Sequence, residues 1–472
     1  MSGQFDVTEL VAIPLTPIHV GGGEESALRP EAYRLKSGML EVFSLHKVFD
    51  MLPDREKLSA MEMILKDPFR GLNRIRDRVP AEAVLERIAL AEESEKELRS
   101  AISPPADTRG RRNGTVLMFQ RAGGRPLLPG SSIKGAFRTG WLARCSQGIE
   151  VPAGGSSSER HHLLQSRAFA LADGKTQTDT DPMRDVTVAD AVLPFEATRI
   201  DRIRTWKRVS EGGKPIWGIP AQEPQLHWER TRSVVDGGEP PTLTLSIGVR
   251  SSATVAARRA VDRPLATPTR SPASVAVLFS ALNEHHWPLW RREAEEKFFA
   301  GDPGARLREA LATFSHLQIA GEDPDAALVR IGRGGHAESK SVEWFREIYR
   351  PQAKTQEHKY TKEGSTRHVL NIAGAAIPFG WMLLIRADRY RAPGKWLALP
   401  TPAMSTPNRS DPSPEPPSRE GASLLFRRGD AAIVDGEPVT IEEDVLPGAR
   451  EVNVRFGTGD TEPVRIEDIK TR

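Results

Sequence analysis

PLLPGSSIKGAFRTGWLARC, residues 126–145, has the pattern of a glycine-containing loop that runs into a helix. Gly130 and Gly135 lack a Cβ atom, so the backbone can turn tightly there and approach a ligand closely. Ser131 or Ser132 could cap the helix that follows. The unpaired N–H groups at the start of such a helix favour a negatively charged ligand.

The same stretch carries two cations and matches a nucleotide P-loop only in part. Lys134 and Arg138 are four residues apart, so they would share one helix face within reach of phosphates. The glycine spacing fits a P-loop, but Ala136-Phe137 stands where lysine and serine or threonine would hold phosphate and magnesium. A helix cap alone would explain the serines but not the paired cations. The stretch therefore indicates a polyanionic ligand other than a nucleoside triphosphate.

The chain holds two further glycine loops, one before this stretch and one after it. Residues 7–20, VTELVAIPLTPIHV, are rich in β-forming residues and run into Gly21, Gly22 and Gly23, which predicts a strand that ends in a glycine loop. RIGRGG, residues 330–335, forms the second glycine loop.

Strand and helix patterns alternate through the first 400 residues, which indicates an α+β fold. The predicted strands lie in 34–44, 115–119, 185–193, 243–249 and 368–387, and the predicted helices in 46–66, 81–102 and 272–320.

The end of the chain has a different composition. Residues 401–422 are dense in proline and serine, which predicts a semi-extended linker. Residues 423–472 alternate apolar and polar residues between Asp-Gly and glycine-rich turns, which predicts a small antiparallel β module, in the manner of a small barrel.

Positive charge is concentrated in two stretches, although the formal net charge is only +3. Residues 104–145 hold eight arginines and lysines against Asp107 alone, and residues 199–217 hold six against two acids. Such clusters are typical of a polyanion-binding surface, but they also occur on ordinary solvated faces. Trp206 and Trp217 lie within the second stretch and could stack on bases or belong to the core.

The remaining composition limits where and how the protein works. The single cysteine, Cys145, excludes an intrachain disulfide and a cysteine-cluster metal site. No basic segment followed by an apolar run opens the chain, and no run of apolar residues is long enough to cross a bilayer. We therefore expect a cytoplasmic protein with no membrane partner.

Few residues are candidates for catalysis. His19 and His46 are the early histidines that could act as a general acid or base on RNA, but a histidine in a strand-end loop more often makes a hydrogen bond or an RNA contact. Asp185 and Asp190 are interpreted as turn residues or partners of Arg184. HExxH, Cys/His-cluster and GxSxG patterns do not occur. We expect no catalytic residue, no metal and no cofactor.

Six segments together resemble one family. LTPIHVGGG (15–23), PLLPGSSIKGAFRTGWL (126–142), DPMRDVTVADA (181–191), VRIGRGG (329–335), STRHV (365–369) and IPFGWM (377–382) are similar in order and character to the RAMP superfamily of CRISPR proteins, and most closely to subunit five of the type III-A Csm effector complex. The resemblance covers about residues 8–390. The second glycine loop departs from the family's G-x-G-S-G form, and the tail after residue 400 has no counterpart in the family.

The resemblance implies a fold and a function. It implies tandem ferredoxin-like (RRM-like) domains at residues 1–195 and 196–400, with insertions. It also implies a non-catalytic subunit that binds the guide crRNA, caps its 3′ end and assists its maturation and the assembly of the complex in antiviral defence. The implied partners are crRNA, the other Csm-type subunits and, indirectly, target RNA, with host ribonucleases as candidates for 3′ trimming. The alternatives are a RAMP ribonuclease that processes crRNA and another type III backbone subunit.

By position, the resemblance and the glycine loops assign RNA contacts to fourteen residues. These are His19, Gly21, Gly22, Gly23, Gly130, Ser131, Ser132, Lys134, Gly135, Arg138, Arg330, Gly332, Arg333 and Gly334. In such assemblies base pairing reads the sequence while protein contacts the RNA backbone.

Overall fold

The structure is a computed structural model of the 472-residue chain. It describes residues 5–23, 26–102, 114–152, 156–169, 181–211, 214–220, 223–251, 254–255, 270–296, 302–349, 360–399, 430–434, 437–442, 451–456, 461–465 and 469–471. The chain forms two compact units, Met1–Pro402 and Ala403–Arg472. No helix in the described residues is both long enough and apolar enough to cross a membrane.

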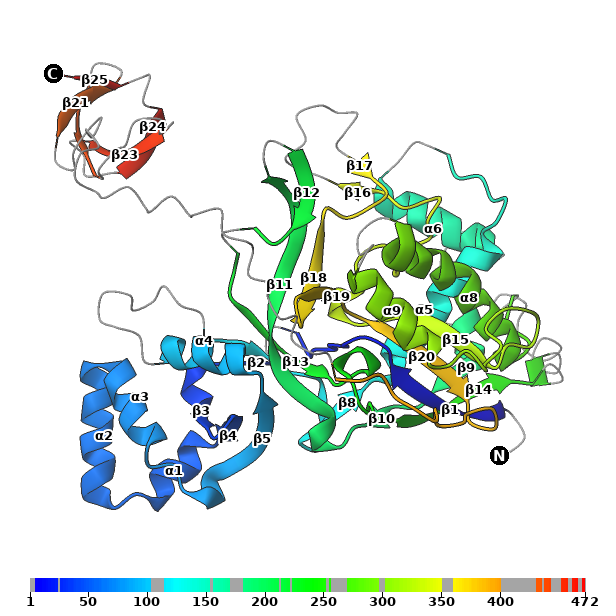
Figure 1. Cartoon of the computed structure of the whole chain (residues 1–472), viewed down its shortest axis with the longest axis horizontal. Coiled ribbons are helices and arrows are strands. Elements are labelled where there is room, and N and C mark those ends of the chain that lie inside the picture. The colour runs from blue at the N-terminus through cyan, green and yellow to red at the C-terminus, as the bar shows by residue number, and fades with distance from the viewer. Residues whose placement is uncertain are drawn as a thin grey trace, which may run out of the picture. The chain divides into compact units, whose positions relative to one another are not determined.

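The first unit is built around a five-stranded antiparallel sheet in the order β15-β20-β1-β14-β9 (Figure 1). Its elements are β1 (Phe5–Pro14), α5 (Gly130–Cys145), β9 (Val186–Val188), β14 (Leu243–Arg250), α8 (Val275–Arg291), β15 (Ala326–Arg330) and β20 (Trp381–Arg386). The strands β20-β1-β14-β9, with α5 after β1 and α8 after β14, have the ferredoxin-like arrangement. We call these five strands the ferredoxin-like sheet. It combines strands from both sides of the predicted 195/196 boundary.

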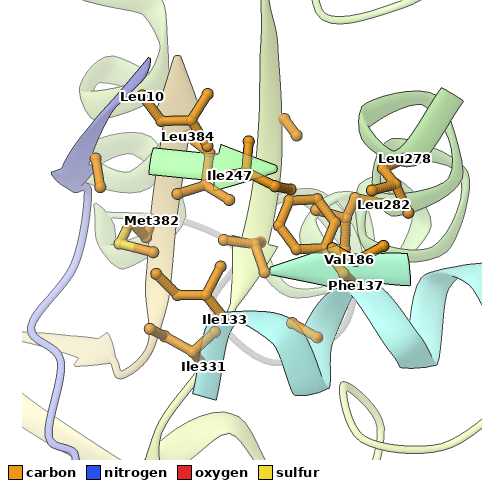
Figure 2. Close-up of a cluster of buried hydrophobic side chains, with 14 of the residues drawn as sticks. Leu10, Ile133, Phe137, Val186, Ile247, Leu278, Leu282, Ile331, Met382 and Leu384 are labelled. Atoms are coloured by element: carbon orange, nitrogen blue, oxygen red, sulfur yellow. The ribbon is translucent and has the colours of Figure 1, made fainter. Parts of the chain in front are cut away.

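Residues 10–14 of β1 and 381–385 of β20 are all apolar and buried because both faces of the ferredoxin-like sheet are covered there. Successive side chains of a strand point to opposite faces. Leu10 therefore lies in one core with α5 and α8, while Val11 lies in a second core with α9 (Asp302–Ala312). Figure 2 shows the first core, where Phe137 of α5 and Leu278 of α8 lie with side chains of the sheet. Phe137 also stacks on Phe279, with ring centroids 6.2 Å apart. This packing fixes where α5 begins.

A second sheet lies in the same unit, in the order β2-β6-β13-β11-β5-β4-β3, with β12, β18 and β19 joined to it through β11 and β18. It includes the parallel pairs β5–β11 and β6–β13. The strands are β2 (Ala27–Leu28), β3 (Tyr33–Lys36), β4 (Met39–Phe43), β5 (Val84–Leu90), β6 (Val116–Leu117), β11 (Thr198–Glu211), β12 (Lys214–Gly218), β13 (Leu226–Thr231), β18 (Thr366–Ile372) and β19 (Ala375–Pro378). The two sheets give the α+β fold predicted from the sequence.

The helix predicted over residues 81–102 is wrong in its first half. Val84–Leu90 forms β5, which pairs with β4 and β11, and the helix α4 begins only at Glu92 and ends at Ile102. The segment VLERIAL places Ile88 in the core and leaves Leu85 exposed, so it presents one apolar face to the neighbouring core. The local pattern of this segment suits a helix as well as a strand, and long-range strand pairing selects the strand. The helices α1 (Leu45–Met51) and α2 (Asp54–Lys66) form where predicted, followed by α3 (Pro68–Arg76).

The second unit contains an antiparallel sheet in the order β24-β23-β22-β21-β25. Its strands are β21 (Ala431–Val434), β22 (Glu437–Ile441), β23 (Glu451–Phe456), β24 (Thr461–Arg465) and β25 (Ile469–Thr471). Alternate residues such as Val439, Ile441 and Val454 form its small core. The predicted β module over 423–472 therefore contains a five-stranded sheet, while the predicted linker at 401–422 lies outside the described residues.

Candidate nucleic-acid interface

Three segments predicted to bind RNA meet at one cavity of about 480 Å³. We call it the glycine groove. It is lined by Val20, Gly21, Gly23, Ser131, Ser132, Gly135, Ala136, Thr139, Arg330, Ile331, Gly332, Arg333, Ser339 and Lys340. The segments are far apart in sequence and are brought together because β1 and β15 both pair with β20, while α5 packs on the same sheet. Glycine backbone, hydroxyl groups and cations thus share one concave surface.

The sequence suggested that Ser131 or Ser132 caps α5, but in the structure an aspartate caps its first turn. The Gly130 N–H donates to Asp190 Oδ1 at 2.7 Å, and the residue at the N-cap position, Pro129, contributes no side-chain bond. Ser131 and Ser132 lie within the first turn of the helix and line the glycine groove. Their hydroxyl groups are thereby available to a ligand.

Gly130 and Gly135 of α5 have different surroundings. A Cβ atom added at Gly130 would lie 2.7 Å from the Ala189 carbonyl oxygen and still closer to that of Val188, so this glycine is required by internal packing. A Cβ atom added at Gly135 would meet nothing within 4 Å. Gly135 is exposed and lines the groove, so its missing side chain leaves room for a ligand.

His19 lies behind the first glycine loop, and its side chain is only 1% exposed. Its Nδ1 is 2.7 Å from the Glu229 carbonyl oxygen, and its ring lies 5.0 Å from that of Trp228. Burial lowers the pKa of His19 to about 4, so the imidazole is neutral at neutral pH. A Cβ atom at Gly21 would lie 2.8 Å from His19 Nε2. His19 therefore supports the loop from below.

His19 also joins the first loop to the second. The Arg333 N–H donates to the His19 carbonyl oxygen at 2.8 Å. Gly332 has a φ of +80°, and a Cβ atom there would collide with the same carbonyl. Gly332 is thus required for the second loop to approach the first.

Two cations stand exposed on the glycine groove. The guanidinium of Arg333 lies over the Trp228 ring at 5.7 Å from its centroid, which orients the side chain. Lys340 is exposed as a residue, and partial desolvation of its ammonium at the groove, together with the charges of Arg330 and Arg333, lowers its pKa below the usual value. Cations that repel one another across a cavity favour binding of an anion between them. Sequence reasoning missed Lys340, although a lysine five residues after a glycine loop was a usable signal.

Arg330 lines the groove but is built into the protein interior. Its Nη1 bonds to Glu293, and its Nε donates to the Phe379 carbonyl oxygen at 3.0 Å. Glu293 also accepts a bond from the Trp381 indole at 3.0 Å. Arg367 extends this buried network to Glu338 at 2.7 Å. The network anchors the start of the second glycine loop beneath the groove.

The other predicted contacts lie outside the lining of the groove. Arg138, 29% exposed, donates to Asp181 and Gln165, each at 2.8 Å, and its guanidinium lies over Phe169. Gly22, Lys134 and Gly334 do not line the groove either. Gly334 is buried against Phe379.

Most described cations of the two basic stretches are paired with carboxylates. In the first stretch, Arg121 bonds to Glu86 and Glu229, and Arg144 bonds to Glu284. In the second, Arg199, Arg202 and Arg204 pair with Asp201, Glu97, Glu223 and Glu93. Arg109, Arg111 and Arg112 lie outside the described residues. Trp206 and Trp217 are partly buried and pack against the second core. The number of arginines and lysines in the two stretches therefore overstates how many of them are available to bind a polyanion.

The acids and histidines considered for catalysis are held in structural contacts. Asp185 pairs with Arg250 at 2.8 Å, and Asp190 caps α5. His46 is exposed next to Asp50 on α1. Within the described ranges, no three of the histidine, cysteine and carboxylate side chains are grouped so as to hold a metal ion.

The sheet order, the two helices and the glycine groove define a ferredoxin-like glycine-loop protein. Residues 13–335 match the model of the RAMP superfamily, and the chain therefore belongs to that superfamily, as predicted.

Comparison with solved structures found similar chains. One is a chain in the cryo-EM structure of a Csm–crRNA–target RNA ternary complex of a type III-A CRISPR–Cas system, with a TM-score of 0.51, 16% sequence identity, and coverage of 80% of this chain and 100% of that one. Another is the crystal structure of T. onnurineus Csm5, with a TM-score of 0.46, 15% identity, and coverage of 79% and 99%. No curated protein matches the sequence.

Proposed function

We propose that this protein is a crRNA-binding subunit of a type III-A Csm effector complex, that it caps the 3′ end of the guide, and that it acts without cutting RNA. The observation that carries the proposal is the glycine groove, where Gly21, Gly135 and Gly332 adjoin the exposed cations Arg333 and Lys340. Glycine backbone permits close approach of a sugar–phosphate chain, and the cations neutralise its charge.

The fold comparison supports the proposal that this protein works within a type III-A effector complex. The structure with a TM-score of 0.51 is that of a complex with crRNA and target RNA. By analogy, the partners proposed here are crRNA and other Csm-type subunits, with target RNA bound indirectly and host ribonucleases trimming the crRNA 3′ end.

RNA binding through the groove can be tested with paired variants. Arg333→Ala and Lys340→Ala should each weaken binding of unrelated single-stranded RNAs to a similar degree, because phosphates carry no sequence. Each should also reduce the slope of log K against log salt by about 0.7. The matched controls are Arg391→Ala and Lys395→Ala, which are exposed cations outside the groove lining. A loss confined to one RNA sequence, or equal losses in the controls, would contradict the groove as the phosphate-binding surface.

The position on the guide and the absence of cleavage need separate measurements. A crRNA with 4-thiouridine at its 3′ end should crosslink to this chain in the assembled complex. A crRNA with 4-thiouridine at its 5′ end should not. Incubation of the protein with labelled crRNA, with Mg²⁺ or with EDTA, should leave the RNA intact. Cleavage that is lost in His19→Ala would instead favour the RAMP ribonuclease, and crosslinks from internal positions alone would favour a backbone subunit.

A further inference from the structure

A second cavity, of about 510 Å³, lies between α8 and the loop that precedes β15, and it shares no lining residue with the glycine groove. We call it the α8 cavity. Its principal lining residues are Asn283, Glu284, Trp287, Ile319, Gly321 and Glu322. Ser280, Asn283, Glu284 and Trp287 follow the spacing of one helix face. The cavity therefore has one helical wall and one loop wall.

The loop wall is held rigidly against the helix. Asn283 Nδ2 donates to the carbonyl oxygens of Ile319 at 2.6 Å and Ala326 at 3.0 Å, while its Oδ1 accepts from the Leu328 N–H at 2.8 Å. Within the loop, the Gln318 N–H donates to Asp325 Oδ2 at 3.0 Å. These hydrogen bonds hold the cavity in shape in the absence of a ligand. Binding therefore does not include the entropic cost of ordering the loop.

An indole forms part of the lining of the α8 cavity. Trp287 is 36% exposed, although tryptophan is usually buried to a much larger extent in a monomeric protein. An aromatic ring that remains open in a concave, preformed site is characteristic of a contact that a partner completes.

Carboxylates lie at the rim of this cavity, and one of them is not neutralised by a neighbouring arginine in the described part of the chain. Glu284 and Glu322 line it, and Asp323 follows on the same loop. Arg144 neutralises Glu284, and Arg386 neutralises Asp323, both through ion pairs. Glu322 is exposed and has no ion-pair partner among the residues that the structure describes. The rim is thus unfavourable for RNA phosphates and favourable for a cation.

We propose that the α8 cavity binds an arginine side chain presented by a protein partner. A planar guanidinium can stack on the Trp287 indole while its N–H groups donate to the Glu322 carboxylate. Arginine suits both contacts better than lysine because its cation is planar and less strongly hydrated. The cavity is a protein-docking site on a subunit whose other surface carries the glycine groove, and its existence does not depend on that groove binding RNA.

The proposal is tested with a short peptide and the full-length protein. The probe is trifluoroacetyl-Gly-Leu-Arg-Leu-Gly-amide, whose ¹⁹F signal broadens on binding and yields a Kd. The matched peptide has citrulline, which keeps the shape of arginine and removes its charge. The arginine peptide should bind about tenfold more tightly, from the cation–π contact and the exposed ion pair together.

Protein variants locate the site. Trp287→Leu keeps an apolar wall but removes the π face and should weaken the arginine peptide about two- to fivefold. Glu322→Gln should weaken the arginine peptide and leave citrulline binding unchanged. Trp344→Leu is the matched control, because Trp344 is 41% exposed and lies outside this cavity. Thermal melting of each variant checks that the fold is intact.

Three results would overturn the assignment. The first is equal binding of the arginine and citrulline peptides by the wild-type protein. The second is wild-type affinity in a folded Trp287→Leu variant. The third is displacement of the peptide by single-stranded RNA in a protein that carries Arg333→Ala and Lys340→Ala, which would assign the cavity to nucleic acid.

Discussion

Gly130→Ala and Gly135→Ala should have opposite effects on stability, although both glycines lie in the same helix and have the same predicted role. A Cβ atom at Gly130 would lie 2.7 Å from the Ala189 carbonyl oxygen and 2.8 Å from its carbon. These are backbone atoms that cannot rotate away. Overpacking of this kind costs about 1–3 kcal/mol, and disturbing the Asp190 cap adds about 1 kcal/mol. We expect Gly130→Ala to lower the free energy of unfolding by about 2–4 kcal/mol.

At Gly135 the same substitution meets open space. Alanine favours a helix over glycine by about 0.5–1 kcal/mol, so Gly135→Ala should raise stability by up to that amount. Its methyl group would project into the glycine groove and reduce the approach of an RNA backbone. Gly135→Ala should therefore be more stable than the wild type and bind RNA more weakly.

Urea unfolding followed by tryptophan fluorescence measures the first effect cleanly, because all nine tryptophans lie before residue 402 and report on the first unit alone. A change in midpoint at constant slope gives the change in stability. Fluorescence anisotropy with labelled single-stranded RNA gives the affinity. A Gly130→Ala protein with the wild-type midpoint would refute the close packing against β9, and a Gly135→Ala protein with wild-type affinity would refute the groove as the RNA path.

Three other outcomes are expected. Arg138→Ala should lower the free energy of unfolding by about 1 kcal/mol, because it loses the ion pair with Asp181 and the hydrogen bond to Gln165. It should change RNA affinity less than Arg333→Ala does, and the same urea and anisotropy measurements compare the two variants. The pKa of His19 falls from 6.5 in the unfolded chain to about 4 in the fold, so between these pH values the unfolded state binds more protons and stability drops as the pH falls. His19→Asn should reduce the slope of stability against pH by up to one proton. An unchanged slope in urea midpoints would contradict the buried neutral imidazole. Truncation after Pro402 should preserve the melting temperature of the first unit and its RNA affinity, whereas aggregation or loss of binding would make the β module part of the RAMP core.

The sequence predicted the α+β class, the strands that flank the glycine loops and the three segments that line the groove. Local patterns sufficed there, because an apolar strand that ends in glycines and a glycine–serine turn before a helix leave few other structures. The position of β5 was not predictable in this way. Its residues suit a helix as well as a strand, and only pairing with β4 and β11 selects the strand.

The roles of individual groove residues were decided by the tertiary structure. Gly130 and Gly135 look equivalent in sequence, yet only the packing of α5 on β9 turns one into a structural requirement and leaves the other open to solvent. Arg138 and Arg333 are both cations in glycine-rich segments, yet Asp181 engages the first and Trp228 orients the second. A sequence determines which groups a chain carries. Which of them remain free to meet a ligand depends on partners distant in sequence, and the fold alone brings those partners together.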